Sequence, residues 1–259
     1  MIEDGLRKKK LFSIVTVVYN GQKHIEQTIQ SVLSQKGNDI EYIIVDGKST
    51  DNTLSIIKKY EDKIDYWISE KDNGIYNAMN KGIDLCTGKY IGFINADDWY
   101  EENIFDKLVQ KTKSNPDYIV GDVKIVNKKL EYVNSLKLDI KNFKRTMPFG
   151  HPALFVKKEI LNKYKFDEKY KIVSDYDFCI KLILNEYRFE YLPAFVSNFR
   201  LGGVSNTLNT SKELFKIQQN HFGFIHAVYW YLVRSNNPIV LAFLKIVSTP
   251  LNFIRKFTR

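Results

Sequence analysis

The sequence predicts an α/β protein whose mainly parallel sheet is flanked by helices. Between residues 12 and 94, short runs rich in Val and Ile alternate with segments whose apolar residues recur at helical spacing. The strand runs are continuously apolar, which is typical of parallel strands covered on both faces. The chain has 259 residues, 44% of them hydrophobic, and is long enough to bury the core of such a domain.

Strands and helices alternate in the first part of the chain. Ile25, Ile29 and Val32 recur at helical spacing, so a helix is expected after the first strand. The strands are predicted at 12–18, 41–45, 66–69 and 90–94. The next two helices are predicted at 54–60 and 78–85.

Beyond residue 98 the alternation becomes less regular. Helices are predicted at 103–113, 173–184 and, as one long aromatic helix, 211–233. An antiparallel strand pair is predicted at 118–126 and 130–136. Asn236-Asn237-Pro238 breaks the long helix, and an amphipathic piece follows to the C-terminus. We therefore expect one domain at about 10–205 and a C-terminal helical extension at 206–259.

The net charge of +9 favours an anionic partner, and its distribution is uneven. From residue 214 onward there are six basic residues, nine aromatic residues and no Asp or Glu. No stretch reaches the ~20 apolar residues that span a bilayer. The basic and apolar residues at 7–18 lack a cleavage site, so they are interpreted as a strand rather than a signal peptide. The two cysteines are expected to be buried and reduced, as in a cytosolic protein.

Polar residues follow each of the first four predicted strands. In open parallel sheets, ligands bind outside the carboxyl ends of the strands, which all lie at one edge. The sequence therefore predicts a polar, carboxylate-rich pocket at that edge. The segments expected there are 19–21, 46–51, 70–74 and 95–98.

Common nucleotide and hydrolase motifs are absent from the sequence. It contains no GxGxxG after the first strand, no P-loop, no zinc-protease histidine pair and no GxSxG elbow. Asp97 and Asp98 follow an apolar strand, where their oxygens suit Mg²⁺ or Mn²⁺ bound with a diphosphate. Alternatively, the pair caps the next helix. Asp46 could accept a hydrogen bond from a base or ribose, while Ser49 to Asp51 could cap a helix.

Five motifs follow one another in the first part of the chain. They are SIVTVVYN at 13–20, IQSVLSQ at 29–35, DGKSTDNT at 46–53, SEKDNGIYNAMNKG at 69–82 and FINADD at 93–98. Together they resemble the family 2 glycosyltransferases of GT-A fold. The resemblance covers roughly residues 11–205 and suggests a donor-binding half at about 10–100 and an acceptor half at about 101–205.

The resemblance implies an inverting enzyme that moves a hexose from a nucleotide-diphospho-sugar, expected to be a UDP-sugar, to a saccharide hydroxyl. It implies Asp98 as the ligand of a divalent cation, Mn²⁺ or Mg²⁺, although Asn95 stands where the fuller motif has an acid. Residues matching the donor site are Thr16, Tyr19, Asn20, Asp46, Ser49, Asp72, Gly74 and Asp97.

On the acceptor side, the resemblance implies Asp175 as catalytic base, with Ser174 in place of the usual Glu. An alternative is that Ser174 or Asp175 only caps its helix. Gly150 to Ala153 matches an acceptor-side strand, so His151 is expected to contact phosphate, metal or acceptor, or else to be structural. Arg200, in an expected loop at 200–205, could neutralise the diphosphate.

The resemblance also implies surface-polysaccharide synthesis, such as O-antigen or capsule, on a lipid-linked acceptor. The basic, aromatic extension would then attach the enzyme to anionic lipid at the cytoplasmic face of the inner membrane. Alternatively, the aromatic residues pack within the protein or in a homo-oligomer.

Two other functions are less consistent with the sequence. A nucleotidyltransferase would need a glycine-rich phosphate loop, and a basic protein that binds membrane or nucleic acid would not need acidic strand ends, so no nucleic-acid partner is expected.

Overall fold

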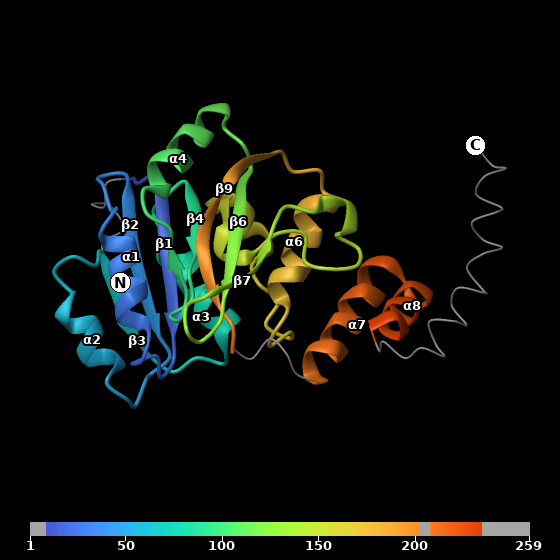
Figure 1. The fold of residues 1–259 in the computed structure, drawn as a ribbon, viewed down its shortest axis with the longest axis horizontal. Coiled ribbons are helices and arrows are strands. Elements are labelled where there is room, and N and C mark those ends of the chain that lie inside the picture. The colour runs from blue at the N-terminus through green and yellow to red at the C-terminus, as the bar shows by residue number, and fades with distance from the viewer. Residues whose placement is uncertain (1–8, 203–207, 235–259) are drawn as a thin grey trace. The chain divides into compact units, whose positions relative to one another are not determined.

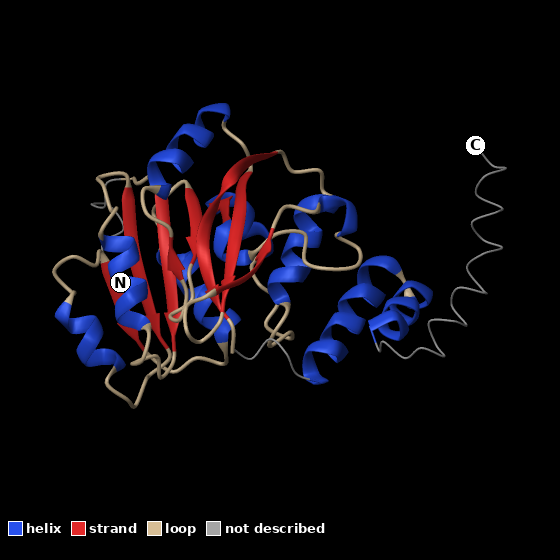
Figure 2. Cartoon of the chain, in the orientation of Figure 1, coloured by secondary structure: helices blue, strands red, loops and turns tan. Residues whose placement is uncertain are grey.

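The computed structural model describes residues 9–202 and 208–234. By its internal contacts the chain divides into two units, residues 1–203 and residues 204–259. The first unit holds a mixed sheet with helices on both faces (Figure 1, Figure 2). The second holds two helices.

The predicted parallel sheet is confirmed. Strands β3, β2, β1 and β4 lie side by side in this order and all run in the same direction. Every residue of β1 and β2 is buried, as expected for strands covered on both faces. The bounds are β1 Phe12–Val18, β2 Ile40–Asp46, β3 Tyr66–Ser69 and β4 Tyr90–Phe93.

The sheet continues beyond β4 with a change of direction. β8 pairs antiparallel with both β4 and β6, so β6 again runs in the direction of β1. β9 runs parallel to β6, and β5 pairs with β9. The predicted antiparallel pair is confirmed as β6 and β7. The bounds are β5 Trp99–Tyr100, β6 Tyr118–Val126, β7 Tyr132–Leu136, β8 Leu154–Lys157 and β9 Phe189–Arg200.

Alternating side chains of β1 pack into two cores, one on each face of the sheet. Ile14 packs with residues of α1, α2 and α4, and Val15 packs with residues of α3, α5 and α6. A Cβ on Gly82 of α3 would lie 2.6 Å from a Val15 methyl group, so this helix approaches the sheet closely because Gly82 has no side chain. The helices are α1 Ile25–Leu33, α2 Thr53–Lys59, α3 Ile75–Leu85, α4 Ile104–Lys111, α5 Lys158–Tyr164 and α6 Ser174–Leu184.

Short 3₁₀ segments change two of the expected elements. The last residues of the helix expected at 103–113 belong to a 3₁₀ segment at Thr112–Ser114. The prediction of a strand at 150–153 is wrong, because His151–Ala153 forms a 3₁₀ turn with Pro152 near its start. The strand β8 begins only at Leu154. A third such segment spans Ile140–Asn142.

The second unit corrects the expected single helix at 211–233. It contains α7 Leu208–Phe222 and α8 Phe224–Arg234, separated by Gly223 at φ 88. Such a conformation favours glycine and ends α7. Phe215 contacts Phe224 and Tyr231 across the turn, with ring centroids 6.1 and 5.8 Å apart. The expected amphipathic piece from 238 lies outside the described residues.

Among residues 9–202 and 208–234, no helix is both long enough and apolar enough to cross a membrane.

The two cysteines are free and buried, as expected. Burial raises the pKa of the Cys86 thiol. Both side chains therefore serve packing within the first unit.

A buried glutamate joins three segments at the amino ends of the strands. Glu41 of β2 is 2% exposed. Its carboxylate accepts hydrogen bonds from the Ser13 hydroxyl of β1 and from the Thr87 and Gly88 amides before β4, and the Thr87 hydroxyl donates at 2.9 Å. The carboxylate thus holds β1, β2 and the start of β4 together.

We predict that Glu41→Ala lowers the free energy of unfolding by about 3 kcal/mol or more, because it leaves several buried donors without an acceptor. Urea denaturation monitored by circular dichroism would measure the change. Glu61→Ala, at an exposed site, is the control and should change the stability little. An equal effect of the two substitutions would contradict the role of Glu41.

Candidate functional site

The loops after β1 and β2 are joined by hydrogen bonds. Asn20 takes a left-handed conformation, with φ 52. Its backbone N–H donates to the Ser49 hydroxyl at 2.8 Å, and its side-chain oxygen accepts from the Thr50 N–H at 2.9 Å. Gly21 N–H donates to the Thr53 hydroxyl at 2.9 Å. The two loops therefore form one continuous support, and Asn20 and Ser49 belong to it.

Asp46, at the end of β2, is fully buried. Its Oδ2 accepts from the Ser49 N–H at 3.0 Å and from the Ser69 hydroxyl at 2.6 Å. Its Oδ1 accepts from the Ser49 hydroxyl. Both carboxylate oxygens therefore hold the ends of β2 and β3 in place. The expected contact between Asp46 and a base stays a prediction.

Tyr19 and Thr16, both expected to line a nucleotide pocket, differ in access. Tyr19 follows β1 and is 64% exposed, so its ring is open to a ligand. Thr16 is fully buried within β1, and its hydroxyl lies 3.0 Å from that of the buried Tyr42. Thr16 therefore belongs to the core, and its position does not support the expected contact.

The loops after β2 and β3 touch because Gly47 has no side chain. A Cβ on Gly47 would lie 2.3 Å from Asp72 Oδ2. The other oxygen of Asp72 accepts the Gly74 N–H at 2.9 Å. Gly74 itself has φ 118 and precedes α3, a conformation that favours glycine. Asp72 and Gly74 are thus placed together, beside the loop that Asp46 supports.

The two acids after β4 have different environments. Asp98 is 1% exposed, and its Oδ1 accepts the backbone N–H of Arg200 at 3.0 Å. Its Oδ2 is buried and has no hydrogen-bond partner in the described part of the chain. Burial raises the pKa of Asp98, and the negative charge of Asp97 raises it further. Asp97 is only partly buried and is the more accessible of the two.

Arg200 is the last residue of β9 and is 9% exposed, so it does not stand in the loop expected at 200–205. Its guanidinium donates to the Asp97 carbonyl at 3.2 Å and to Gln27 Oε1 at 2.8 Å, and lies 5.0 Å from the Trp99 ring centre. These contacts hold the Arg200 side chain against the loop that carries Asp97 and Asp98. Neutralisation of a diphosphate by Arg200 stays a prediction.

Asp175 lies in the first turn of α6, where its Oδ1 accepts the backbone N–H of Tyr176 at 2.9 Å. The N-cap position itself is Val173, so neither Ser174 nor Asp175 occupies it. Asp175 Oδ1 lies 2.9 Å from the Tyr76 hydroxyl of α3. That hydroxyl is also 2.8 Å from the carbonyl oxygen of Ile172. The Tyr76 hydroxyl thus connects α3 to the proposed base. The sequence reasoning missed Tyr76, although it sits inside the motif at 69–82.

His151 is buried close to Asp175. Its ring stacks on Phe93 of β4 and meets Phe166 edge-on, with centroids 5.5 and 5.6 Å apart. Its Nε2 has no hydrogen-bond partner among the described residues. Burial lowers the pKa of His151, and the charge of Asp175 opposes this effect only in part. The imidazole is therefore neutral near pH 7.

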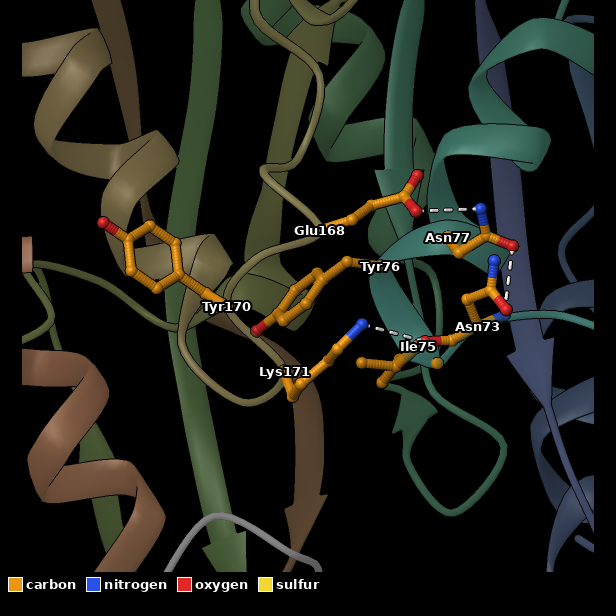
Figure 3. Close-up of a pocket in the computed structure, with 8 residues that line it drawn as sticks. Asn73, Ile75, Tyr76, Asn77, Glu168, Tyr170 and Lys171 are labelled. Carbon is orange, nitrogen blue, oxygen red and sulfur yellow. Dashed lines mark hydrogen bonds between the residues drawn. The ribbon is translucent and has the colours of Figure 1, made fainter.

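A small pocket lies between the start of α3 and the segment that connects α5 to α6 (Figure 3). Its volume of about 10 Å³ is the room of one water molecule. Asn77 donates to Glu168 at 3.0 Å, and the Lys171 ammonium donates to the Asn73 carbonyl at 3.1 Å. These contacts bring residues 73–77 against 168–171, beside the Tyr76–Asp175 pair. Neither Glu168 nor Lys171 was expected from the sequence.

A divalent cation has a plausible position at Asp97 and Asp98. Within residues 9–202 and 208–234, no three His, Cys, Asp or Glu side chains gather into a complete metal site. However, the unpartnered oxygen of Asp98 and the accessible carboxylate of Asp97 are hard oxygen donors of the kind that Mg²⁺ and Mn²⁺ prefer. Because Mg²⁺ commonly binds through one or two carboxylates plus substrate phosphates, the residues fit an ion that binds together with a diphosphate.

A polar, carboxylate-rich edge at the carboxyl ends of parallel strands is typical of the ligand sites of α/β enzymes. Comparison with known proteins defines the class as a glycosyltransferase. Residues 13–189 match the family described as Glycosyl transferase family 2, and the chain belongs to this family. The resemblance expected from the sequence is confirmed.

Relatives and solved structures agree with this assignment. An uncharacterized glycosyltransferase of Methanocaldococcus jannaschii is 29% identical over 97% of this chain and 93% of its own. A putative teichuronic acid biosynthesis glycosyltransferase of Bacillus subtilis, TuaG, is 38% identical over 39% of this chain and 42% of its own. The structure of S. aureus TarS 1-349 in complex with UDP-GlcNAc has a TM-score of 0.66 and 17% identity, and the match covers 86% of this chain and 70% of that chain. The fold is GT-A, as expected.

We predict that His151 makes the stability of the protein depend on pH. The unfolded chain binds a proton at this imidazole near pH 6.5, and the folded chain binds it only at lower pH. The free energy of unfolding should therefore fall as the pH drops below 6.5, and fall less in His151→Gln.

Urea unfolding at a series of pH values would measure the two slopes. His221→Gln is the control, because it removes a histidine of the second unit and leaves His151 in place. Identical slopes for the protein and the His151 variant would show that burial does not keep this imidazole neutral.

Proposed function

We propose that the chain transfers a hexose from a nucleotide-diphospho-sugar, with a UDP-sugar as the expected donor, to a saccharide hydroxyl with inversion. The observation that carries the proposal is the placement of Asp72, Asp97 and Asp175 around the carboxyl ends of one sheet, in a chain of glycosyl transferase family 2. The donor is supported by the structural neighbour that binds UDP-GlcNAc. A neighbour from Pyrobaculum calidifontis was solved with GDP-Man and Mn²⁺.

In this proposal the exposed Tyr19 and the loop supported by Asp46 hold the nucleotide. Asn20 and Ser49 shape this loop, and Asp72 with Gly74 lies beside the sugar. A bound Mn²⁺ or Mg²⁺ would supply positive charge for the leaving diphosphate. Asp97 is the more accessible of the two carboxylates after β4, and the buried Asp98 follows it directly in the chain.

Asp175 is the proposed base. It takes the proton of the acceptor hydroxyl while that oxygen bonds to the anomeric carbon. The bond from this carbon to the diphosphate oxygen breaks, and the nucleoside diphosphate leaves with the electron pair. Attack from the face opposite the leaving group inverts the anomeric carbon. The Tyr76 hydroxyl orients the base by its hydrogen bond, and the neutral His151 lies close enough for the charge of Asp175 to act on it.

The direct test is incubation with a panel of nucleotide-sugars and Mn²⁺, with detection of the released nucleotide. Release of a nucleoside diphosphate supports a glycosyltransferase. Formation of a nucleoside triphosphate and a sugar 1-phosphate when pyrophosphate is added would instead favour the alternative of a nucleotidyltransferase. Proton NMR of the product with an added saccharide would give the anomeric configuration. Retention at that carbon would contradict the role of Asp175.

The resemblance implies Asp98 as the direct ligand, and we propose Asp97 in this role because it is the more accessible of the two carboxylates. Asp97→Asn should weaken the apparent Mn²⁺ affinity by about 100-fold, and Asp98→Asn by about 10-fold, the range for residues that support a ligand. Mn²⁺ titrations of nucleotide release would measure both. Asp106→Asn, at an exposed site of α4, is the control. A larger effect of Asp98→Asn would restore Asp98 as the ligand.

Asp175→Asn should lower turnover by about 100-fold or more, since a positioned base contributes at least this factor. The amide keeps the size of the side chain but cannot take a proton. Donor affinity, measured by titration calorimetry with the nucleotide-sugar, should stay within about twofold because the base contacts the acceptor. A collapse of donor affinity with normal turnover would instead assign Asp175 to donor binding.

We further propose that the acceptor is lipid-linked and belongs to surface-polysaccharide synthesis at the cytoplasmic face of the inner membrane. The relative named for teichuronic acid biosynthesis supports this class of product. The basic, aromatic extension at 206–259 is the proposed membrane contact, with packing in a homo-oligomer as the alternative. Flotation with anionic vesicles before and after removal of residues 236–259 distinguishes the two.

A further inference from the structure

A second apolar and basic surface lies on the first unit, at the hairpin of β6 and β7 (Figure 1). The apolar side chains Leu130, Tyr132 and Val133 are 48%, 60% and 52% exposed. Two lysines, Lys128 and Lys129, are exposed in the turn before them. We name these five residues the hairpin surface. Such a group of large exposed apolar side chains beside positive charge marks an interaction surface.

The turn of this hairpin holds a leucine in an unusual conformation. Leu130 has φ 65, a left-handed conformation that Gly, Asn or Asp adopts more readily. Asn127 fixes the turn, because its side-chain oxygen accepts the N–H groups of Lys129 and Glu131 at 2.8 and 3.1 Å. The turn therefore presents Leu130 to solvent where a polar residue would fit with less strain.

The hairpin surface lies at the edge of the sheet that carries the candidate site. β6 runs in the direction of β1, so the turn after Val126 follows a carboxyl strand end. Val126 is aligned with Arg200 of β9, and its carbonyl accepts the N–H of the exposed Leu201 at 2.8 Å. The same Arg200 holds Asp97 and Asp98. A partner on the hairpin surface would therefore lie beside the edge that carries Asp97 and Asp98.

We propose that the hairpin surface binds an anionic lipid bilayer. Between residues 127 and 145 there are six basic residues and two acidic ones, so the segment attracts negative charge. Lipid satisfies both features of the surface, because headgroups pair with the lysines while Leu130 and Val133 enter the apolar boundary. A nucleic acid would leave these apolar side chains in water. A symmetric second copy would bring the lysines of two chains together.

The inference goes beyond the proposed reaction and does not involve the extension at 206–259. It adds a contact on the first unit itself, so that the edge bearing the site would face the membrane. A lipid-linked acceptor could then reach Asp175 without leaving the bilayer surface. Binding to vesicles is measured without donor or metal, so its outcome is independent of the proposed activity.

The test compares full-length variants in sedimentation with phosphatidylcholine vesicles, with and without phosphatidylglycerol. Lys128→Glu with Lys129→Glu should weaken binding to the anionic vesicles by about 25-fold or more, since each lysine near the surface contributes about fivefold. The charge-matched control is Lys107→Glu with Lys113→Glu, at exposed positions on and just after α4, and should bind far more tightly than the hairpin variant.

A second pair of variants tests the apolar contact. Leu130→Asn with Val133→Thr keeps residues suited to the turn and the strand. It should weaken binding severalfold, and the deficit should persist at high salt, where charge is screened. Leu184→Asn removes a leucine that is 48% exposed at the end of α6 and should bind like the unaltered protein. All variants should retain nucleotide release from the donor.

Three outcomes would overturn the inference. One is absence of binding by the unaltered protein, and another is equal weakening by the hairpin and control variants. The third is unchanged vesicle binding together with loss of a dimer in sedimentation velocity, which would assign the hairpin surface to a second copy. If the unaltered protein released no nucleotide from any donor, the proposed function would be refuted. The conclusion from vesicle binding would not be affected.

Discussion

The parallel alignment of β3, β2, β1 and β4 is the constraint on which the candidate site depends. Because these strands run the same way, the segments after them emerge at one edge, although they are far apart in the sequence. The alignment itself rests on two buried cores and on the Glu41 carboxylate at the opposite ends of the strands. A shift in the strand register would therefore move the carboxylates apart even though none of these residues is itself changed.

At that edge, some polar side chains build the support and others remain available. Asp46 uses both carboxylate oxygens to hold Ser49 and Ser69, and Arg200 is committed to the loop of Asp97. Tyr19 and Asp97 keep exposed surface. This division has a physical reason, since a charged ligand binds best to groups whose positions are fixed before it arrives.

The strands beyond β4 bring the second half of the site to the same edge. β8 reverses the direction of the sheet and β6 restores it, so β9 ends beside Asp98. On the other face, the Tyr76 hydroxyl joins α3 to Asp175 of α6. Hydrogen bonds on both faces thus couple the loops after the first four strands to the later elements of the chain. The hairpin of β6 and β7 extends from the same edge.

The sequence by itself determined the parallel α/β core, the loops at its edge and the family, because alternating apolar runs and local motifs are short-range properties of the chain. It did not determine which polar residues remain accessible to a ligand. Thr16 turned out to lie in the core, and Arg200 proved to be the end of a strand. The break at Gly223 and the partnership of Tyr76 with Asp175 were also decided by packing. Burial and long-range hydrogen bonds depend on which elements become neighbours, and only the tertiary structure sets these neighbours.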